Sequence, residues 1–126
     1  MGLLHEELTS QIIRAFYNIY NGLGYGFLEK VYENAMKIEL EQMGLAVQTQ
    51  VPINVLYKGQ VVGEYFADIL VNNDVIVELK AADALTPAHE AQLLNYLRGV
   101  KREVGLLLNF GPEAKFVRKV FGKKNP

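Results

Sequence analysis

Three charged side chains interrupt two otherwise apolar segments near the middle of this 126-residue sequence. Asp68 lies in the first segment, Glu78 and Lys80 lie in the second, and the polar run 72–74 separates the two. If this run forms a three-residue hairpin loop, Asp68 lies directly opposite Glu78 on one face of the strand pair. Lys80 shares that face, because strand side chains alternate with a period of two. A two-residue turn would make the carboxylates diagonal neighbours, still within reach of one ion.

Two carboxylates held side by side on an apolar hairpin favour a metal ion. They repel each other and are costly to remove from water, and a bound cation offsets both effects. Hard oxygen ligands select Mg²⁺ or Mn²⁺ over zinc. The opposite face of the hairpin carries Val61, Tyr65 and Ile69, so we expect both faces to be largely buried. The alternative is an ordinary charge cluster on an exposed sheet face, which is the more common arrangement for an arbitrary hairpin.

Two further motifs flank the hairpin. Residues 26–32 read G-x-x-E-x-x-Y, and residues 92–96 read Q-x-x-x-Y in a segment with helical periodicity. Together with the charged hairpin, this ordered set resembles the PD-(D/E)XK nuclease superfamily, whose core carries the three charged residues on two adjacent antiparallel strands. The first motif resembles the one that names the GxxExxY family, and the second resembles the helix motif of RecB-like nucleases. Ala67 stands where the superfamily pattern has proline, at a position that supplies no ligand.

The resemblance implies a role for each matching residue. Asp68, Glu78 and the main-chain carbonyl of Leu79 would coordinate Mg²⁺ (or Mn²⁺). Lys80 would orient or polarise the attacking water and offset charge on the phosphoryl transition state. Glu29, the acidic residue of the first motif, would approach the same cleft as an extra metal ligand, either directly or through a metal-bound water.

Several further polar residues are candidates for the same cleft. Glu33 lies one helical turn after Glu29, and a solvated helix flank is the alternative for both glutamates. Gln92 and Tyr96 share a helical face, where they could position the lysine, a phosphate or the nucleic-acid backbone. The other interpretation of Tyr96 is a buried ring that packs on the sheet. His89 ranks last, because a histidine near a helix start more often lies on the surface.

Periodicity places these residues on elements in the order α-α-β-β-β-α-β-β. Three segments have helical spacing of apolar residues, and the Val-, Ile- and Tyr-rich region between the last two predicts three or four antiparallel strands. The expected helices are Glu6–Asn21, Phe27–Met43 and Pro87–Lys101, and the strands lie within Leu45–Ala81, Val104–Phe110 and Lys115–Phe121. The apolar run 104–110 predicts a strand with two buried faces beside a parallel neighbour. The expected fold class is α/β, a mixed β-sheet flanked by helices, which the resemblance makes restriction-endonuclease-like.

Length and composition limit the alternatives. A chain of 126 residues fits one compact domain, and the balance of 50% apolar to 21% charged residues excludes a disordered or fibrous class. The absence of cysteine excludes disulfides, thiolate catalysis and zinc–thiolate sites. The sequence has no secretory signal and no apolar run near the ~20 residues of a membrane span. A cytoplasmic protein with no membrane partner is therefore expected.

The formal net charge of −1 averages two unlike parts of the chain. Residues 1–100 contain six Lys or Arg and twelve Asp or Glu, a net of −6, whereas residues 101–126 contain seven and two, a net of +5. The basic part, which includes a tail at about 115–126, contains Lys101, Arg102, Lys115, Arg118, Lys119, Lys123 and Lys124. Folded beside the cleft, these residues could contact several phosphates. A solvated solubility tail is the alternative, because only Phe116 and Phe121 are available for base stacking.

These observations and the resemblance lead to one main hypothesis. We expect a Mg²⁺-dependent nuclease that hydrolyses a phosphodiester bond in DNA, ahead of RNA, by in-line attack of a metal-activated water. The alternative is a catalytically inactive module of the same fold that binds nucleic acid or protein, and a third option is an interaction subunit of a larger system. Because 126 residues accommodate little beyond a catalytic core, a homo-oligomer or a protein partner is a further expectation.

Overall fold

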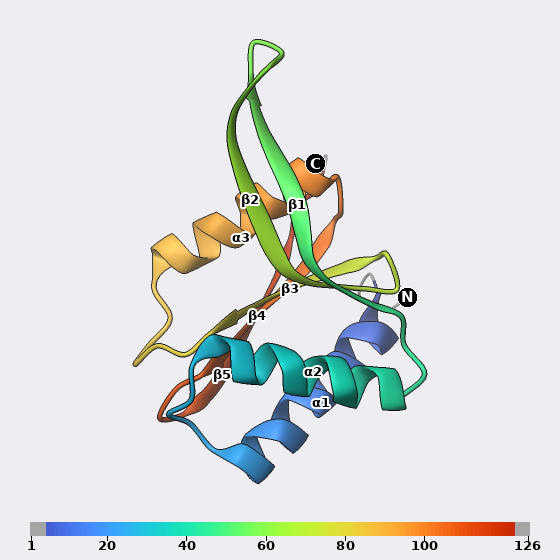
Figure 1. Cartoon of the computed structure of the whole chain (residues 1–126), viewed down its shortest axis with the longest axis vertical. Helices are drawn as coiled ribbons and strands as arrows, with labels where there is room; N and C mark the ends of the chain where they lie inside the picture. Colours follow the sequence, from blue (N-terminus) through green and yellow to red (C-terminus); the bar gives the residue numbers. More distant parts are fainter. Residues whose placement is uncertain (1–4, 123–126) are drawn as a thin grey trace.

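A five-stranded sheet with helices on both faces forms the body of the molecule (Figure 1). The computed structural model describes residues 5–122. In chain order, the elements are α1 (Glu6–Leu23), α2 (Glu29–Gln42), β1 (Val47–Tyr57), β2 (Gln60–Val71), β3 (Val75–Lys80), α3 (Pro87–Val100), β4 (Val104–Phe110) and β5 (Ala114–Val120). This is the predicted order, with three strands in the region for which three or four were expected.

The strands lie side by side in sequence order, β1-β2-β3-β4-β5. All neighbouring strands are antiparallel except β3 and β4, which are parallel. A parallel connection has to cross a face of the sheet, and α3 makes that crossover. Every residue of β4 is buried, which confirms the predicted strand with two covered faces and a parallel neighbour. The mixed α/β sheet predicted from the sequence is therefore present.

Each face of the sheet has its own apolar core. Helices α1 and α2 cover one face, where Phe16, Tyr32 and Leu106 are fully buried. Helix α3 covers the other face, where Leu93 packs with Ile76. Within residues 5–122, no helix has both the length and the apolar character needed to cross a membrane. The elements that border the predicted site therefore belong to two different layers, α2 on one face and α3 on the other.

The hairpin of β1 and β2 extends beyond both helical layers as a two-stranded arm, residues 54–66 (Figure 1). Val61 and Tyr65, which we expected to be buried, are 57% and 49% exposed. That expectation was wrong because the helical layers end beside this part of β2, where the ring of Tyr96 on α3 lies against Tyr65 but leaves it half-exposed. It was right for Ile69 and Val71, which are fully buried in the core under α1 and α2.

Many cations of the basic C-terminal part belong to the folded body. Residues 114–120 form β5, which pairs with β4 at the edge of the sheet, so this stretch is a strand and not a tail. Lys119 makes an ion pair with Glu90 of α3, with Nζ and Oε1 2.7 Å apart. Lys123 and Lys124 lie outside the described residues.

Candidate active site

Strands β2 and β3 pair over only three positions and then separate. Val71 pairs with Val75, which confirms the predicted three-residue loop, and the last paired residue of β2 is Ile69. Beyond it, β2 follows β1 into the arm, whereas β3 stays beside β4. The separation leaves a gap, here called the fork, between Asp68 on β2 and residues 78–80 on β3. The charged residues singled out in the sequence therefore lie where the sheet divides.

A left-handed residue on β1 accompanies this separation. Gln50 has φ 54°, and it lies between the two β1 residues that pair with Ile69 and Ala67. Such a residue interrupts the regular alternation of a strand and increases its local twist. Accordingly, Ile69 packs in the core under α1 and α2, whereas Ala67 packs in the core under α3. Asp68 lies at the turning point between the two layers.

The carboxyl groups of Asp68 and Glu78 bond across the fork. The Leu79 N–H donates to Asp68 Oδ2 at 2.8 Å, and the Asp68 N–H donates to Glu78 Oε2 at 2.9 Å. Each carboxyl takes the place of the carbonyl acceptor that a paired strand would provide, so these N–H groups keep a partner. These two hydrogen bonds fix both carboxyls against the backbone of the opposite strand. The structure thus brings together the two acidic residues that the sequence placed opposite each other.

Burial raises the pKa of both carboxyls, and neighbouring carboxylates add to the rise. Burial, followed by the charge of Asp68, raises the pKa of Glu78 from its ordinary 4.5 to about 9. A side-chain hydrogen bond between the two carboxyls acts in the same direction. Burial also raises the pKa of Asp68, against the lowering effect of its hydrogen bond from the Leu79 N–H. The pair therefore holds a proton at neutral pH, and a cation bound between the carboxyls would relieve the same repulsion.

Lys80 ends β3 and is held by α3. Its Nζ donates to Gln92 Oε1 at 3.1 Å. The sequence offered the lysine, a phosphate or the nucleic-acid backbone as partners of Gln92, and in the structure Gln92 binds the lysine. The ammonium group is close enough to the acidic pair to act against the rise in the pKa of both Asp68 and Glu78. One lysine does not neutralise two carboxylates, so the pair keeps its proton while no other cation is bound.

Tyr96 combines the two features that the sequence offered as alternatives. Its ring packs in the core under α3 and lies against the ring of Tyr65, with the centroids 6.0 Å apart. Burial, followed by the charges of Glu78 and Asp68, raises the pKa of the Tyr96 hydroxyl to about 12. The hydroxyl is therefore a neutral hydrogen-bond donor close to the acidic pair.

The two glutamates of α2 approach the fork from the other layer. Glu29 is exposed and accepts a hydrogen bond from the Ala81 N–H at 3.3 Å. Glu33 is only 5% exposed and accepts from Gln50 Nε2 at 2.7 Å. Apart from burial, the charge of Glu33 and then that of Glu29 raise the pKa of Asp68. The sequence ranked Glu29 first, whereas the structure gives Glu33 the deeper position beside Asp68.

The tyrosine of the G-x-x-E-x-x-Y motif, to which sequence reasoning gave no functional role, holds the loop before α2. Tyr32 is fully buried, and its ring stacks on Phe110 at a centroid distance of 4.0 Å. Its hydroxyl donates to the Gly24 carbonyl at 2.7 Å and accepts from the Phe27 N–H at 3.3 Å. Gly26 has φ 112°, which side chains other than glycine rarely allow. Both residues therefore position the start of the helix that carries the two glutamates.

Sequence reasoning also missed Asn109. Its buried side chain accepts from the Ala82 N–H at 2.9 Å and donates to the Ala82 carbonyl at 3.0 Å. Next to it, Gly111 is required, because a β-carbon there would meet the Ala82 carbonyl. These contacts fix the chain directly after Lys80. A signal was available, since Asn109 is the only polar side chain in the apolar run 104–110.

His89 belongs to the start of α3 and not to the fork. Its Nδ1 accepts from the Thr86 N–H at 3.1 Å, and its own N–H donates to Thr86 Oγ1 at 3.3 Å. These reciprocal bonds form a capping box that satisfies backbone donors at the helix N-terminus. His89 therefore lies near the surface at the start of a helix, which was the more common of the two positions considered for it.

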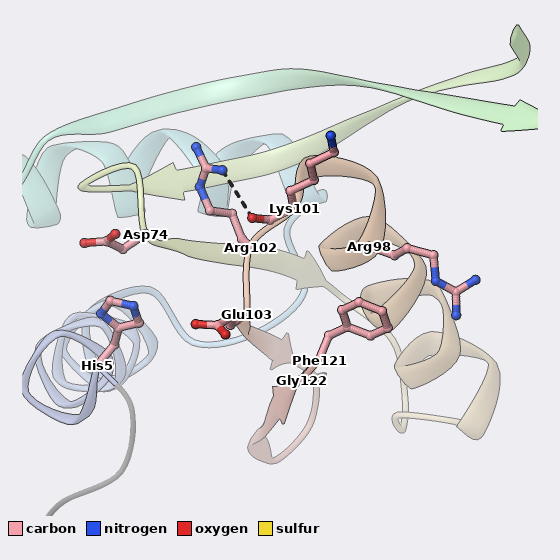
Figure 2. A pocket seen from close by; sticks show the side chains of 8 residues that line it. All are labelled: His5, Asp74, Arg98, Lys101, Arg102, Glu103, Phe121 and Gly122. Atoms are coloured by element: carbon pink, nitrogen blue, oxygen red, sulfur yellow. Dashed lines mark hydrogen bonds between the residues drawn. The ribbon is translucent and has the colours of Figure 1, made fainter. Parts of the chain in front are cut away.

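A basic cluster lies at the far end of β3 from Lys80. Arg98, Lys101 and Arg102 line a pocket of about 570 Å³ (Figure 2). The other lining residues are His5, Asp74, Glu103, Phe121 and Gly122. Arg102 is engaged in the fold, because it donates to both the carbonyl and the side chain of Asn73 at 2.7 Å. The pocket adjoins the start of β3, and a strand rises about 3.3 Å per residue, so roughly 10–16 Å of strand separates it from residues 78–80 at the fork. The condition under which Lys101 and Arg102 could contact phosphates at the cleft, that they fold beside it, is therefore not met.

Comparison with known proteins identifies the family. A model of the PD-(D/E)XK nuclease superfamily matches residues 6–120. The chain belongs to the PD-(D/E)XK nuclease superfamily. Membership supports a nuclease-type function with a nucleic-acid substrate. No curated protein sequence matches the chain.

Two solved structures share the restriction-endonuclease-like fold of this superfamily member. The crystal structure of SSO0001 is similar with a TM-score of 0.57 and 17% identity, over 95% of this chain and 61% of that one. An alkaline exonuclease from Laribacter hongkongensis is similar with a TM-score of 0.55 and 10% identity, over 97% of this chain and 73% of that one. The chain thus spans less than two thirds of the length of SSO0001. At these identities the likeness concerns the fold.

The donor set at the fork fits a divalent metal ion, the cofactor that PD-(D/E)XK nucleases generally use. Asp68 and Glu78 provide hard carboxylate oxygens, and their pKa values are raised first by burial and then by neighbouring carboxylates, an effect that a bound cation would oppose. Within residues 5–122, no three acidic or histidine side chains already surround a common point. Any remaining ligands would therefore be the Leu79 carbonyl, water, or a glutamate of α2.

Proposed function

We propose that this protein is a Mg²⁺-dependent nuclease, with Mn²⁺ as a substitute, that hydrolyses phosphodiester bonds in DNA. The observation that carries the proposal is the fork. The buried carboxyl of Glu78 and the half-buried carboxyl of Asp68 bond across separated strands, and Lys80 lies on the same strand as Glu78 and lowers the pKa of both. A pair of carboxyls that can exchange its proton for a metal ion, with one lysine beside it, suits metal-assisted attack on a phosphodiester.

Each residue at the fork has a distinct task in this reaction. Asp68 and Glu78, with the carbonyl of Leu79, would hold the metal ion, which lowers the pKa of a bound water and offsets charge on the phosphate. Lys80 orients the attacking water and stabilises the negative charge that develops on the phosphoryl oxygens. Gln92 acts through Lys80, because its Oε1 holds the ammonium group at 3.1 Å. The protonated hydroxyl of Tyr96 is available to donate a hydrogen bond to a phosphate oxygen.

Cleavage assays on labelled DNA test this assignment. With Mg²⁺ or Mn²⁺, the wild-type protein should cut DNA, and Asp68→Asn or Lys80→Ala should reduce the rate by at least a hundredfold while leaving the thermal unfolding transition cooperative. Lys58→Ala, at the tip of the arm, is the matched control and should cut at the wild-type rate. Undiminished cleavage by both site variants would overturn the proposal, because contaminating nuclease would then explain the activity.

Calorimetric titration with Mn²⁺ separates the nuclease from a catalytically inactive module of the same fold. Wild-type protein should bind Mn²⁺, and Asp68→Asn should not. Absence of Mn²⁺ binding by the wild type, together with absence of cleavage, would favour the binding module.

A matched pair of DNA and RNA oligonucleotides of one sequence tests the preference for DNA. Equal cleavage of both would remove that preference from the proposal. A cytoplasmic location stays a prediction.

Self-association through the arm is part of the same proposal. Seven large apolar side chains of the arm are 40–64% exposed: Val55, Leu56, Tyr57, Val61, Val62, Tyr65 and Phe66. At roughly 100 Å² each they present on the order of 700 Å² per chain, close to the ~800 Å² that each partner contributes to a standard interface. Light scattering should detect a dimer, and Leu56→Lys with Val62→Lys should make it monomeric. A monomer at all concentrations of the wild type would refute self-association alone.

A further inference from the structure

A cavity of about 560 Å³ adjoins the fork at the end of β3. Three loops enclose it. They are residues 25–29 leading into α2, residues 81–83 after β3, and residues 110–112 at the end of β4 and the turn that follows it. The cavity lies beside the candidate active site, because Glu29 lines it and accepts a hydrogen bond from the Ala81 N–H, directly after Lys80.

The loop before α2 presents apolar side chains at this cavity. Tyr25 is 59% exposed, Phe27 is 46% exposed and Leu28 is 82% exposed, and all three line the cavity. Exposed aromatic side chains grouped at a cavity mark a binding surface more often than isolated ones do. Their rings have the flat faces on which nucleobases stack.

Buried contacts fix this loop in place. The hydroxyl of Tyr32 bonds to the Gly24 carbonyl and the Phe27 N–H, and the ring of Phe27 lies edge-on to the ring of Tyr32 at 6.0 Å. On the opposite wall, the Tyr20 hydroxyl donates to the Gly111 carbonyl at 2.7 Å. A cavity whose walls are held in advance requires little ordering when a ligand binds.

The charges of the lining residues indicate what part of a nucleic acid fits. Among the residues that line the cavity, Glu29 and Asp83 carry negative charge, and none carries positive charge. A phosphate would be repelled here, whereas a nucleobase is uncharged, has a stacking face and carries N–H groups that carboxylates accept. The cavity therefore suits a base and not a backbone.

We propose that this cavity receives an unpaired nucleobase next to the phosphate that is cleaved at the fork. The inference rests on the proposed function and names its substrate class, a single strand or a frayed end. A paired base is enclosed by its partner and its stacked neighbours, so it has to leave the helix before it enters such a cavity. Tyr25 and Phe27 would stack on the base, and Glu29 and Asp83 would accept hydrogen bonds from its edge.

Fluorescence binding with 2-aminopurine oligonucleotides tests the proposal. Ca²⁺, which also takes oxygen ligands, replaces Mg²⁺ so that binding is measured apart from cleavage. The wild-type protein should bind a single strand more tightly than the duplex of the same sequence, and stacking should quench the 2-aminopurine signal. Tyr25→Ala should weaken single-strand binding about tenfold, in the range for loss of one base–aromatic stack. Phe27→Leu, which keeps an apolar contact with Tyr32, should reduce the quenching.

Two controls make the outcome specific. Tyr17→Ala removes a partly exposed aromatic ring from α1, outside the cavity, and should leave single-strand affinity unchanged. Duplex affinity of Tyr25→Ala should stay within twofold of the wild-type value. Tight duplex binding with no preference for the single strand, or unchanged binding and quenching in both loop variants, would overturn this inference and leave the nuclease proposal intact. If the wild type bound neither form and cut neither, both proposals would fail.

Discussion

Replacing Glu78 by glutamine should stabilise the metal-free protein at neutral pH while abolishing its metal-dependent activity. The raised pKa of the buried Glu78 is the reason. Below pH 4.5 the group is protonated in both the folded and the unfolded chain, so it imposes no cost. Above pH 4.5 the unfolded chain releases the proton while the folded chain keeps it, so the free energy of unfolding falls until the pH reaches about 9.

The size of the effect follows from the same two pKa values. At pH 7 the unfolded chain is 2.5 pH units above the ordinary pKa of 4.5, and each unit corresponds to about 1.4 kcal/mol, so the penalty is on the order of 3 kcal/mol. A domain of this size has a total stability of about 5–15 kcal/mol, so the change is readily measured. Glutamine stays neutral, and its side-chain oxygen can still accept the hydrogen bond from the Asp68 N–H.

Urea unfolding between pH 4.5 and pH 8.5, in the presence of a chelator, measures this prediction. Wild-type stability should decline across the range, and Glu78→Gln should decline much less and exceed the wild type by roughly 2–3 kcal/mol at pH 7. Glu64→Gln, at an exposed position of the arm, is the matched control and should follow the wild-type curve. Added Mn²⁺ should stabilise the wild type but not Glu78→Gln. A wild-type curve that rises with pH, or a variant less stable than the wild type at pH 7, would refute the reasoning.

Three further substitutions test residues that position the site. Tyr32→Phe removes the hydroxyl that holds the loop before α2, and unfolding experiments should find a loss of about 1–3 kcal/mol, whereas an unchanged stability would contradict this role. Asn109→Leu leaves the Ala82 N–H and carbonyl without partners, so it should cost a similar amount and also lower kcat, and a normal kcat in the folded variant would count against a link to Lys80. Gln92→Leu should lower kcat severalfold with little change in KM or in the free energy of unfolding. A fall in kcat that is accompanied by a clear loss of stability would indicate a purely structural role.

Local patterns in the sequence predicted the strand pair and its register. A period of two, a polar run of three residues and apolar flanks are enough to set Val71 against Val75, because hairpin pairing depends on residues close in sequence. The same kind of pattern predicted the buried strand β4 with its parallel neighbour. These features determined which side chains lie near one another on β2 and β3, and thus the acidic pair.

The sequence by itself therefore determined the order of the elements, the pairing of the hairpin and the residue types at the fork. Only the tertiary structure decided that β2 leaves β3 at Asp68, that Glu33 is buried beside it, and that the arm extends past the helices that would cover it. It also placed Lys101 and Arg102 at the far end of β3. The physical reason is that pairing and alternation are local, whereas burial and charge proximity depend on which distant segments pack against a strand.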